Sequence, residues 1–350
     1  MEIKILTFHK ANNYGALLQC YALSKILSGW ENNVELINID FHKKPANFRN
    51  KIKLMLDLQR MNQFRKNQLP QQTVLYKKED ELINNLPTAD CYIVGSDQVW
   101  NPQLTKEFCS LFFFSFLPHN AKRIAFAASF GINEWIYPDM QLKIKDLLSK
   151  FSFIGIREND GVRICDQTFG VNATKTLDPT LLVDSYSDLF KPRRNTKKMT
   201  LLSYYFNKSN SYYKNLRSFA KELQLQPLSL NDQKYHAGIK SIPFVSVSRW
   251  LAEINSASFV LTNSFHCMVF AIIFKKPFVV VPANPSRMSR ITNFLEDLGL
   301  ENRYFESMEK LIDKYDKEVQ INYVEVFEKL EKLKFDSLKF LRNSIAETAI

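Results

Sequence analysis

The sequence lacks the local signatures of several common protein classes. It has five cysteines in 350 residues and no CxxC pair, which argues against a zinc site or a disulfide framework and is typical of reduced thiols in a cytoplasmic protein. None of its nine glycines forms a GxGxxG motif, which argues against a nicotinamide or flavin enzyme. It also contains no internal repeat and no low-complexity tract.

Two further absences concern membranes and nucleic acids. No apolar run is as long as a membrane span, and the first apolar run, at residues 3–8, is broken too soon for a signal peptide. The formal net charge of +11 favours an anionic partner, but the basic residues are dispersed, so we do not expect a nucleic-acid-binding protein. We therefore expect a cytoplasmic protein whose only membrane contact would be peripheral, at the inner face of the cell membrane.

The pattern that is present predicts an α/β protein. Short apolar runs alternate with helix-length segments, which indicates parallel βαβ units, and the length suffices for two domains. A basic segment with one proline, residues 191–198, is the expected linker. We predict domains at residues 1–190 and 199–322, followed by a terminal helix within residues 323–350 that packs on the body.

The most informative stretch begins with the apolar run at residues 259–262. Asn263, Ser264 and His266 follow it, at the start of a helix-length apolar segment. Ligands of open α/β sheets bind just beyond the carboxyl ends of the strands, so His266 is the best-placed titratable group in the chain. The alternative is that Asn263 or Ser264 only caps the helix and that His266 is a buried core histidine.

Polar residues also follow strands in the first half. Residues 9–15 join the first strand to a helix, where backbone N–H groups can bind an anion or a sugar hydroxyl. Residues 95–101 follow another buried strand. There, Asp97 can act as a base or orient a hydroxyl, and Trp100 can stack on a sugar face. The alternative for this segment is a structural turn.

Arginines provide candidate anion sites. Arg157 follows the apolar run at residues 151–156, and its guanidinium suits a carboxylate or phosphate; the alternative is a surface ion pair with Glu158. Arg287 and Arg290 are three residues apart around a predicted helix start, hence near neighbours on one face. Two cations at the positive end of a helix can form a phosphate-binding site, although they can also be solvated surface residues.

These motifs resemble the polysaccharide pyruvyl transferase family over residues 3 to about 304. The resemblance rests on these runs, in chain order: Asn13-Tyr14-Gly15-Ala16-Leu17-Leu18-Gln19, Gly95-Ser96-Asp97-Gln98-Val99-Trp100-Asn101, Arg157-Glu158, Asp178-Pro179-Thr180, Thr262-Asn263-Ser264-Phe265-His266, and Arg290-Ile291 before Leu298-Gly299-Leu300. It implies two Rossmann-like doubly wound domains that face a central cleft, as in GT-B glycosyltransferases. Some relatives have arginine at the position of Ser264, a role that Arg287 or Arg290 can take here, and near relatives often have aspartate at that of Asn263.

The resemblance also implies an activity. Pyruvate is transferred from phosphoenolpyruvate to two hydroxyls of one sugar, in a surface polysaccharide or its precursor, which gives a cyclic ketal. Phosphoenolpyruvate is thus the expected co-substrate and a lipid- or nucleotide-linked glycan the expected acceptor. We expect no metal and no further cofactor. The rival interpretations are a nucleotide-sugar glycosyltransferase of GT-B architecture and a non-catalytic glycan-binding protein.

The chemistry of this transfer assigns roles to the candidate residues. An enol ether becomes electrophilic only when its methylene carbon takes a proton, so a general acid is needed and His266 is the expected one. Arg157 would bind phosphate or carboxylate, and Asp97 would orient or deprotonate a hydroxyl. The residues expected to bind substrate are Asn13, Gly15, Gln19, Ser96, Gln98, Trp100, Glu158, Asn263, Ser264, Arg287 and Arg290.

Overall fold

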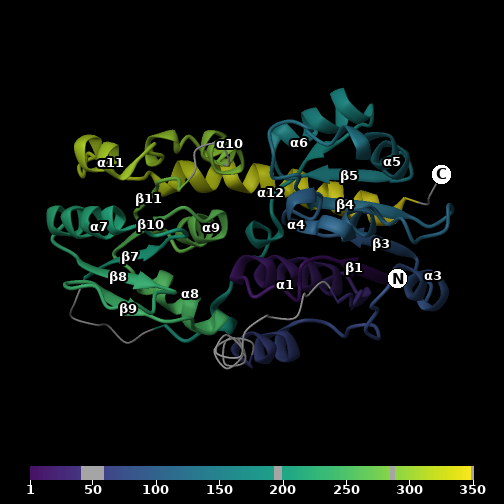
Figure 1. Cartoon of the computed structure of the whole chain (residues 1–350), viewed down its shortest axis with the longest axis horizontal. Coiled ribbons are helices and arrows are strands. Elements are labelled where there is room, and N and C mark those ends of the chain that lie inside the picture. Colours follow the sequence, from purple (N-terminus) through teal and green to yellow (C-terminus); the bar gives the residue numbers. More distant parts are fainter. Residues whose placement is uncertain (41–58, 193–198, 284–287, 348–350) are drawn as a thin grey trace. The chain divides into compact units, whose positions relative to one another are not determined.

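A computed structural model describes residues 1–40, 59–192, 199–283 and 288–347 of the chain (Figure 1). These residues form two compact units, each described here by itself. The first unit contains residues 1–40, 65–184 and 331–347, and the second contains residues 59–64, 185–192, 199–283 and 288–330. Neither unit is one continuous segment, because residues 59–64 belong to the second unit and the last part of the C-terminal helix α12 (Tyr323–Ala346) belongs to the first.

The first unit is built on a six-stranded parallel sheet. In sheet order its strands are β2 (Asn33–Leu36), β1 (Glu2–Leu6), β3 (Cys91–Val94), β4 (Arg123–Ala128), β5 (Phe153–Ile156) and β6 (Thr174–Lys175). β3 and β4 are buried along their whole length, as expected of parallel strands covered on both faces. The chain changes direction along the sheet between β1 and β3, so a topological switch point lies at their carboxyl ends.

Helical segments connect these strands. They are α1 (Tyr14–Gly29), α3 (Glu79–Asn85), α4 (Pro102–Thr105), η1 (Lys106–Phe113), α5 (Pro138–Leu148), α6 (Asn159–Arg163), η2 (Ile164–Phe169) and η3 (Pro179–Leu181), and residues 59–68 are also helical. Aromatic rings of η1 and of the loop after β4 form much of the core on one side of the sheet. The five cysteines of the chain are all buried and free.

The second unit has a five-stranded parallel sheet with a different order. Its strands are β11 (Phe278–Val280), β10 (Phe259–Thr262), β7 (Thr200–Tyr204), β8 (Gln226–Leu230) and β9 (Lys240–Ile242). Its helical segments are η4 (Ser187–Leu189), α7 (Asn210–Glu222), α8 (Val247–Ser256), α9 (Phe265–Ile273), α10 (Ser289–Leu298), η6 (Glu301–Arg303) and α11 (Met308–Lys314). The switch point of this sheet lies between β7 and β10, at the end of the apolar run that precedes Asn263.

The structure confirms the predicted class, a mixed α/β protein with parallel sheets. Within the described ranges, no helix combines the length and the apolar character needed to cross a membrane.

Candidate active site

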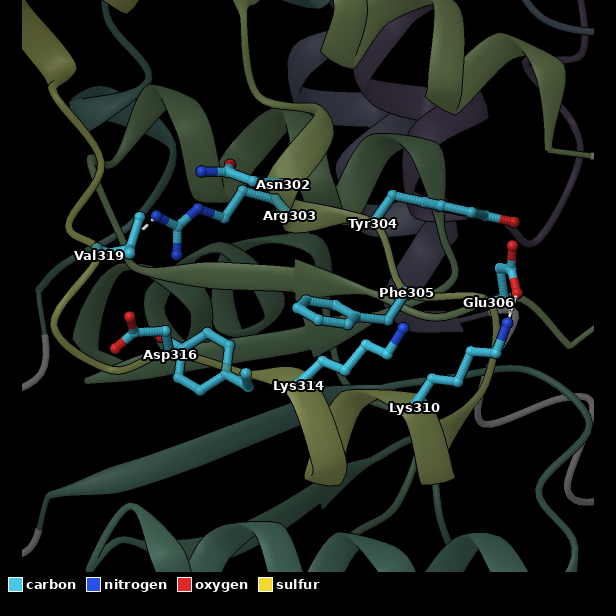
Figure 2. Close-up of a pocket in the computed structure, with 10 residues that line it drawn as sticks. Asn302, Arg303, Tyr304, Phe305, Glu306, Lys310, Lys314, Asp316 and Val319 are labelled. Atoms are coloured by element: carbon cyan, nitrogen blue, oxygen red, sulfur yellow. Dashed lines mark hydrogen bonds and ion pairs between the residues drawn. The ribbon is translucent and has the colours of Figure 1, made fainter.

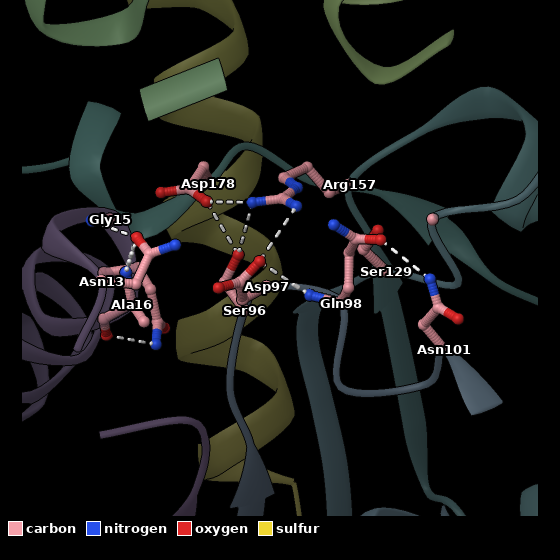
Figure 3. A network of polar contacts seen from close by, with 12 residues as sticks. Asn13, Gly15, Ala16, Ser96, Asp97, Gln98, Asn101, Ser129, Arg157 and Asp178 are labelled. Atoms are coloured by element: carbon pink, nitrogen blue, oxygen red, sulfur yellow. Dashed lines mark hydrogen bonds and ion pairs between the residues drawn. The ribbon is translucent and has the colours of Figure 1, made fainter. Parts of the chain in front are cut away.

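At the carboxyl ends of β3 and β5, a fully buried carboxylate holds two polar side chains (Figure 3). Asp178 accepts a hydrogen bond from Ser96 Oγ at 2.8 Å and one from Arg157 Nη1 at 2.6 Å. Its other oxygen accepts hydrogen bonds from the backbone N–H and the hydroxyl of Thr180, at 3.0 and 2.6 Å. Asp178 therefore fixes both Ser96 and Arg157, two residues predicted for the site.

Asp97 has a backbone conformation that is uncommon for residues other than glycine. Its φ is +81°, in the left-handed region, immediately beyond β3. Oδ1 of Asp97 accepts a hydrogen bond from the backbone N–H of Gln98 at 2.9 Å and lies 3.8 Å from Arg157 Nη2. Strain of this kind concentrates at functional sites. The side chain of Asp97 is 15% exposed, so this carboxylate reaches solvent beside a buried cation.

The guanidinium of Arg157 is already surrounded by negative charge. Burial alone would lower the pKa of Arg157, but the carboxylates of Asp178, Asp97 and Glu158 outweigh burial and raise it. An incoming anion would have to compete with these carboxylates. Binding of phosphate or carboxylate by Arg157 stays a prediction. The geometry favours a role in which Arg157 orients the side chain of Asp97.

The predicted sugar-stacking role of Trp100 is wrong. Its side chain is completely buried, its indole N–H donates to the carbonyl of Phe112 at 2.9 Å, and its ring stacks on Phe113 with centroids 4.8 Å apart. The ring therefore belongs to the hydrophobic core of the first unit. The structural interpretation of residues 95–101 is therefore correct for Trp100, whereas the functional interpretation, carried by the partly exposed Asp97, stays a prediction.

Three further residues predicted to contact substrate are instead buried structural residues. Gln19 donates to the Thr7 hydroxyl and to the Ala16 carbonyl, both at 2.8 Å. Glu158, 1% exposed, accepts hydrogen bonds from the Ser129 hydroxyl and from backbone N–H groups of the loop after β4. Ser96 is also fully buried, with its hydroxyl on Asp178. Each of these three side chains is closed to solvent and forms hydrogen bonds with protein atoms, so it supports the edge of the sheet.

Gln98 lies beside the loop after β4. Its side-chain carbonyl accepts a hydrogen bond from Asn101 at 2.8 Å (Figure 3). It packs so closely on Gly131, whose φ is +65°, that a Cβ atom at that position would lie 2.0 Å from the Gln98 oxygen. Gly131 is thus required for the placement of Gln98.

The predicted anion site at the start of α1 is occupied by the protein itself. The side-chain oxygen of Asn13 accepts hydrogen bonds from the backbone N–H groups of Gly15 and Ala16, at 2.9 and 3.3 Å. Asn13 is therefore the N-cap of α1, and these N–H groups are already satisfied. The side chain of Asn13 remains exposed at the edge of the sheet.

The loop after β1 is held by a residue that the sequence did not point to. Arg65, largely buried, donates to the backbone carbonyls of His9, Lys10 and Ala11, each at 2.8 Å. Burial lowers the pKa of Arg65 to about 10. Nothing in the local sequence marks this arginine, because its partners lie more than fifty residues away.

His266 lies at the corresponding edge of the second sheet. It is the second residue of α9, 8% exposed, and its ring meets that of Phe265 edge to face with centroids 5.4 Å apart. Ser264 is the N-cap of α9 and accepts a hydrogen bond from the N–H of Cys267 at 3.4 Å, so the capping interpretation is correct for Ser264. The helix start fixes the imidazole directly beyond β10.

Asn263 joins the two strands at the second switch point. Its side-chain oxygen accepts a hydrogen bond from the backbone N–H of Phe206 at 2.9 Å, and its side-chain N–H donates to the carbonyl of Phe206 at 3.1 Å. The hydroxyl of Thr262 donates to the carbonyl of Tyr204 at 2.6 Å. Asn263 does not cap α9. It ties the end of β10 to the segment after β7.

The arginine pair is described in part. Arg290 lies in the first turn of α10, as predicted, whereas Arg287 lies outside the described residues. The structure therefore describes one of the two arginines that were predicted to form a phosphate-binding site. No group of three or more His, Cys, Asp or Glu side chains in the described ranges is arranged to hold a metal ion.

The second unit also contains a groove of about 470 Å³ between η6 and α11 (Figure 2). It is lined by Asn302, Arg303, Tyr304, Phe305, Glu306, Lys310, Lys314, Tyr315, Asp316 and Val319. None of the residues predicted for the site lines this groove. The candidate site residues of each unit lie at the edge of its own sheet, beside its switch point, and not in this groove.

Comparison with known proteins identifies the family to which the chain belongs. A sequence model of the family described as polysaccharide pyruvyl transferase matches residues 13–285, which include the polar segments of both sheet edges. The chain belongs to the polysaccharide pyruvyl transferase family. A search of curated proteins gives no match.

Solved structures show the same fold at low sequence identity. Arabidopsis thaliana UGT89C1 complexed with UDP-L-rhamnose is 8% identical, with a TM-score of 0.59 and 99% of both chains covered. UDP-GlcNAc 2-epimerase from Neisseria meningitidis bound to UDP-GlcNAc is 10% identical, with a TM-score of 0.55 and 98% of this chain and 99% of the other covered. S. aureus MnaA in a UDP co-structure is 12% identical, with a TM-score of 0.53, covering 99% and 91%. These are structures of the GT-B type with Rossmann-like domains.

Proposed function

We propose that this protein transfers pyruvate from phosphoenolpyruvate to two hydroxyls of one sugar of a glycan acceptor and releases phosphate. The observation that carries the proposal is the position of His266, fixed at the start of α9 and beyond β10 in a chain of the pyruvyl transferase family. Protonation of a carbon atom at neutral pH needs a general acid, and histidine is the usual choice. The acceptor is a lipid- or nucleotide-linked precursor of a surface polysaccharide.

The reaction begins with proton transfer. His266 protonates the methylene carbon of phosphoenolpyruvate, and the neighbouring carbon gains oxocarbenium character. The first sugar hydroxyl adds to that carbon and loses its proton to Asp97. The bond from this carbon to the phosphate oxygen then breaks, phosphate leaves, and the second hydroxyl adds and loses its proton. The products are a ketal with a new methyl group and inorganic phosphate, so the two hydroxyl protons balance one proton on carbon and one on phosphate.

Arg157 acts in this scheme through Asp97. Its guanidinium lies between Asp178 and Asp97, at 2.6 and 3.8 Å, and so keeps the Asp97 carboxylate oriented as the hydroxyl approaches. Arg290, in the first turn of α10, is the proposed contact for the phosphate, because a helix N-terminus favours an anion.

The test is product analysis. The purified protein is incubated with phosphoenolpyruvate and a panel of lipid-linked and nucleotide-linked sugars, and products are examined for the mass of a pyruvate ketal and for released phosphate. We expect both with at least one acceptor. Transfer of the sugar from a UDP- or GDP-sugar, with no use of phosphoenolpyruvate, would instead identify a glycosyltransferase. Glycan binding with no product of either kind would identify a binding protein.

A further inference from the structure

The segment after β7 exposes an aromatic ring at the second switch point. Phe206 is 45% exposed, although it directly follows the buried Tyr204 and Tyr205. The carboxyl ends of β7 and β10 flank the position where doubly wound sheets bind their ligands. Almost half of this ring is therefore accessible to a ligand at the switch point.

The protein holds the backbone of Phe206 from two sides. The amide of Asn263 bonds to both the N–H and the carbonyl of Phe206, at 2.9 and 3.1 Å. Two residues further on, Lys208 donates to the Ser229 hydroxyl at 2.9 Å and to the Leu230 carbonyl at 2.8 Å, which ties the segment to β8. This short loop is therefore fixed to both neighbouring strands of the sheet.

The ring itself is also oriented. Phe206 packs edge to face on Tyr204, with centroids 5.2 Å apart and an interplanar angle of 72°. A ring that is oriented before binding loses little conformational entropy when a ligand packs on it. Asn263, which holds this ring, is two residues from Phe265 and three from the candidate acid His266. Phe206 and His266 thus follow two neighbouring strands of one sheet, β7 and β10.

We propose that Phe206 is the platform on which a pyranose ring of the acceptor stacks. The apolar C–H face of a pyranose matches an aromatic face, while its hydroxyls match polar groups such as those of Asn263 and Ser264 at the rim. The choice of a sugar as ligand rests on the proposed function. Phe206 takes the stacking role that the sequence had suggested for Trp100, whose ring is buried.

The test is ligand-observed saturation-transfer NMR with the methyl pyranosides of glucose, galactose, mannose and N-acetylmannosamine, and with uridine monophosphate in parallel. We expect at least one pyranoside to bind the wild-type protein, and we expect Phe206→Ala to weaken that binding about tenfold, the loss of one well-packed aromatic contact. Phe206→Trp should retain binding. The matched control is Phe335→Ala, which removes an exposed phenylalanine, 66% accessible, from α12.

Three results of the binding measurement would overturn the inference. They are equal pyranoside binding by Phe206→Ala and the wild type, absence of pyranoside binding by the wild type, and loss of uridine monophosphate binding alone in Phe206→Ala, which would indicate a nucleobase platform. The measurement needs no phosphoenolpyruvate, so it is independent of turnover. If the wild type binds a pyranoside through Phe206 but forms no ketal, the proposed function fails and the platform stands. If ketal forms while Phe206→Ala keeps the wild-type acceptor KM, the platform fails alone.

Discussion

The two sheet edges of this protein carry different chemistry. The edge after β3 and β5 is built on ionised groups, in which buried Asp178 holds Arg157 and Arg157 lies beside Asp97. The edge after β7 and β10 is built on neutral hydrogen bonds, in which Thr262 and Asn263 bind backbone atoms of the neighbouring strand. The first arrangement fixes a charge, and the second fixes the position of a histidine and an aromatic ring.

The difference is physically informative because buried ionic networks and neutral hydrogen bonds respond differently to mutation. Removal of one member of a buried ion pair leaves the other charge without compensation, whereas removal of a neutral hydrogen bond costs much less. Two histidines that follow central strands also differ. His9, beyond β1, is completely buried and has its Nδ1 3.1 Å from the carbonyl oxygen of Thr7, whereas His266 begins a helix. We assign acid chemistry to the second histidine only.

The largest expected effect is on turnover. Replacement of His266 by glutamine should lower kcat about 10² to 10⁴-fold, because the general acid is lost. The matched control is His119→Gln, at an exposed histidine of the first unit, and it should leave kcat unchanged. Steady-state phosphate release from phosphoenolpyruvate measures both. Wild-type turnover by His266→Gln would remove the proton donor from our scheme.

The next largest effect is expected when the ion pair between Arg157 and Asp178 is removed. We expect Arg157→Ala to reduce the free energy of unfolding by about 3–5 kcal/mol, because Asp178 would remain as a buried, uncompensated carboxylate. The double variant Arg157→Met with Asp178→Asn removes both charges, keeps a side-chain acceptor beside Ser96 and Thr180, and should recover part of this stability while remaining inactive. Urea unfolding measures both variants. A single variant as stable as the wild type would show that the pair does not fix the edge.

The burial of His9 should make the stability of the protein depend on pH. Burial lowers the pKa of His9 to about 4, below its ordinary value of 6.5, so between these values the unfolded chain binds a proton that the folded protein does not. The corresponding stability is fully present above pH 6.5 and falls as the pH drops toward 4, by about 3 kcal/mol in total. His9→Gln should flatten this part of the stability curve, measured by urea unfolding at several pH values. An unchanged slope would contradict the assigned burial of His9.

The smallest effect is expected at the neutral edge. Asn263→Ala removes two hydrogen bonds to the backbone of Phe206 and should reduce the free energy of unfolding by about 1–2 kcal/mol. Sugar binding should also weaken, since the loop after β7 loses its support. Asn263→Asp keeps the acceptor but loses the donor, and we expect an intermediate result. A loss for Asn263→Ala as large as that for Arg157→Ala would abolish the contrast between the edges.

Much of this site could be predicted from the sequence, because in a parallel sheet the carboxyl ends of all strands lie at one edge. That rule alone brings residues 95–101 and Arg157 together, and it places His266 beyond a strand. The αβ alternation also predicts the fold class. Strand order cannot be derived in this way, since two sheets with the same alternation here have different orders.

What the sequence could not supply was the partner of each polar side chain. Asp178 was visible only as part of a family motif, and its contact with Arg157 spans twenty-one residues of chain. Trp100 was misassigned because a local pattern does not show that the rings of η1 would cover it.

The most direct test of the central claim is the reaction in deuterium oxide with phosphoenolpyruvate and a glycan acceptor, followed by NMR and mass analysis of the product. We expect a pyruvate ketal whose methyl group carries one deuterium from solvent, together with one inorganic phosphate for each ketal formed. A product that retains the enol methylene, or a sugar transferred without phosphate release from phosphoenolpyruvate, would contradict it.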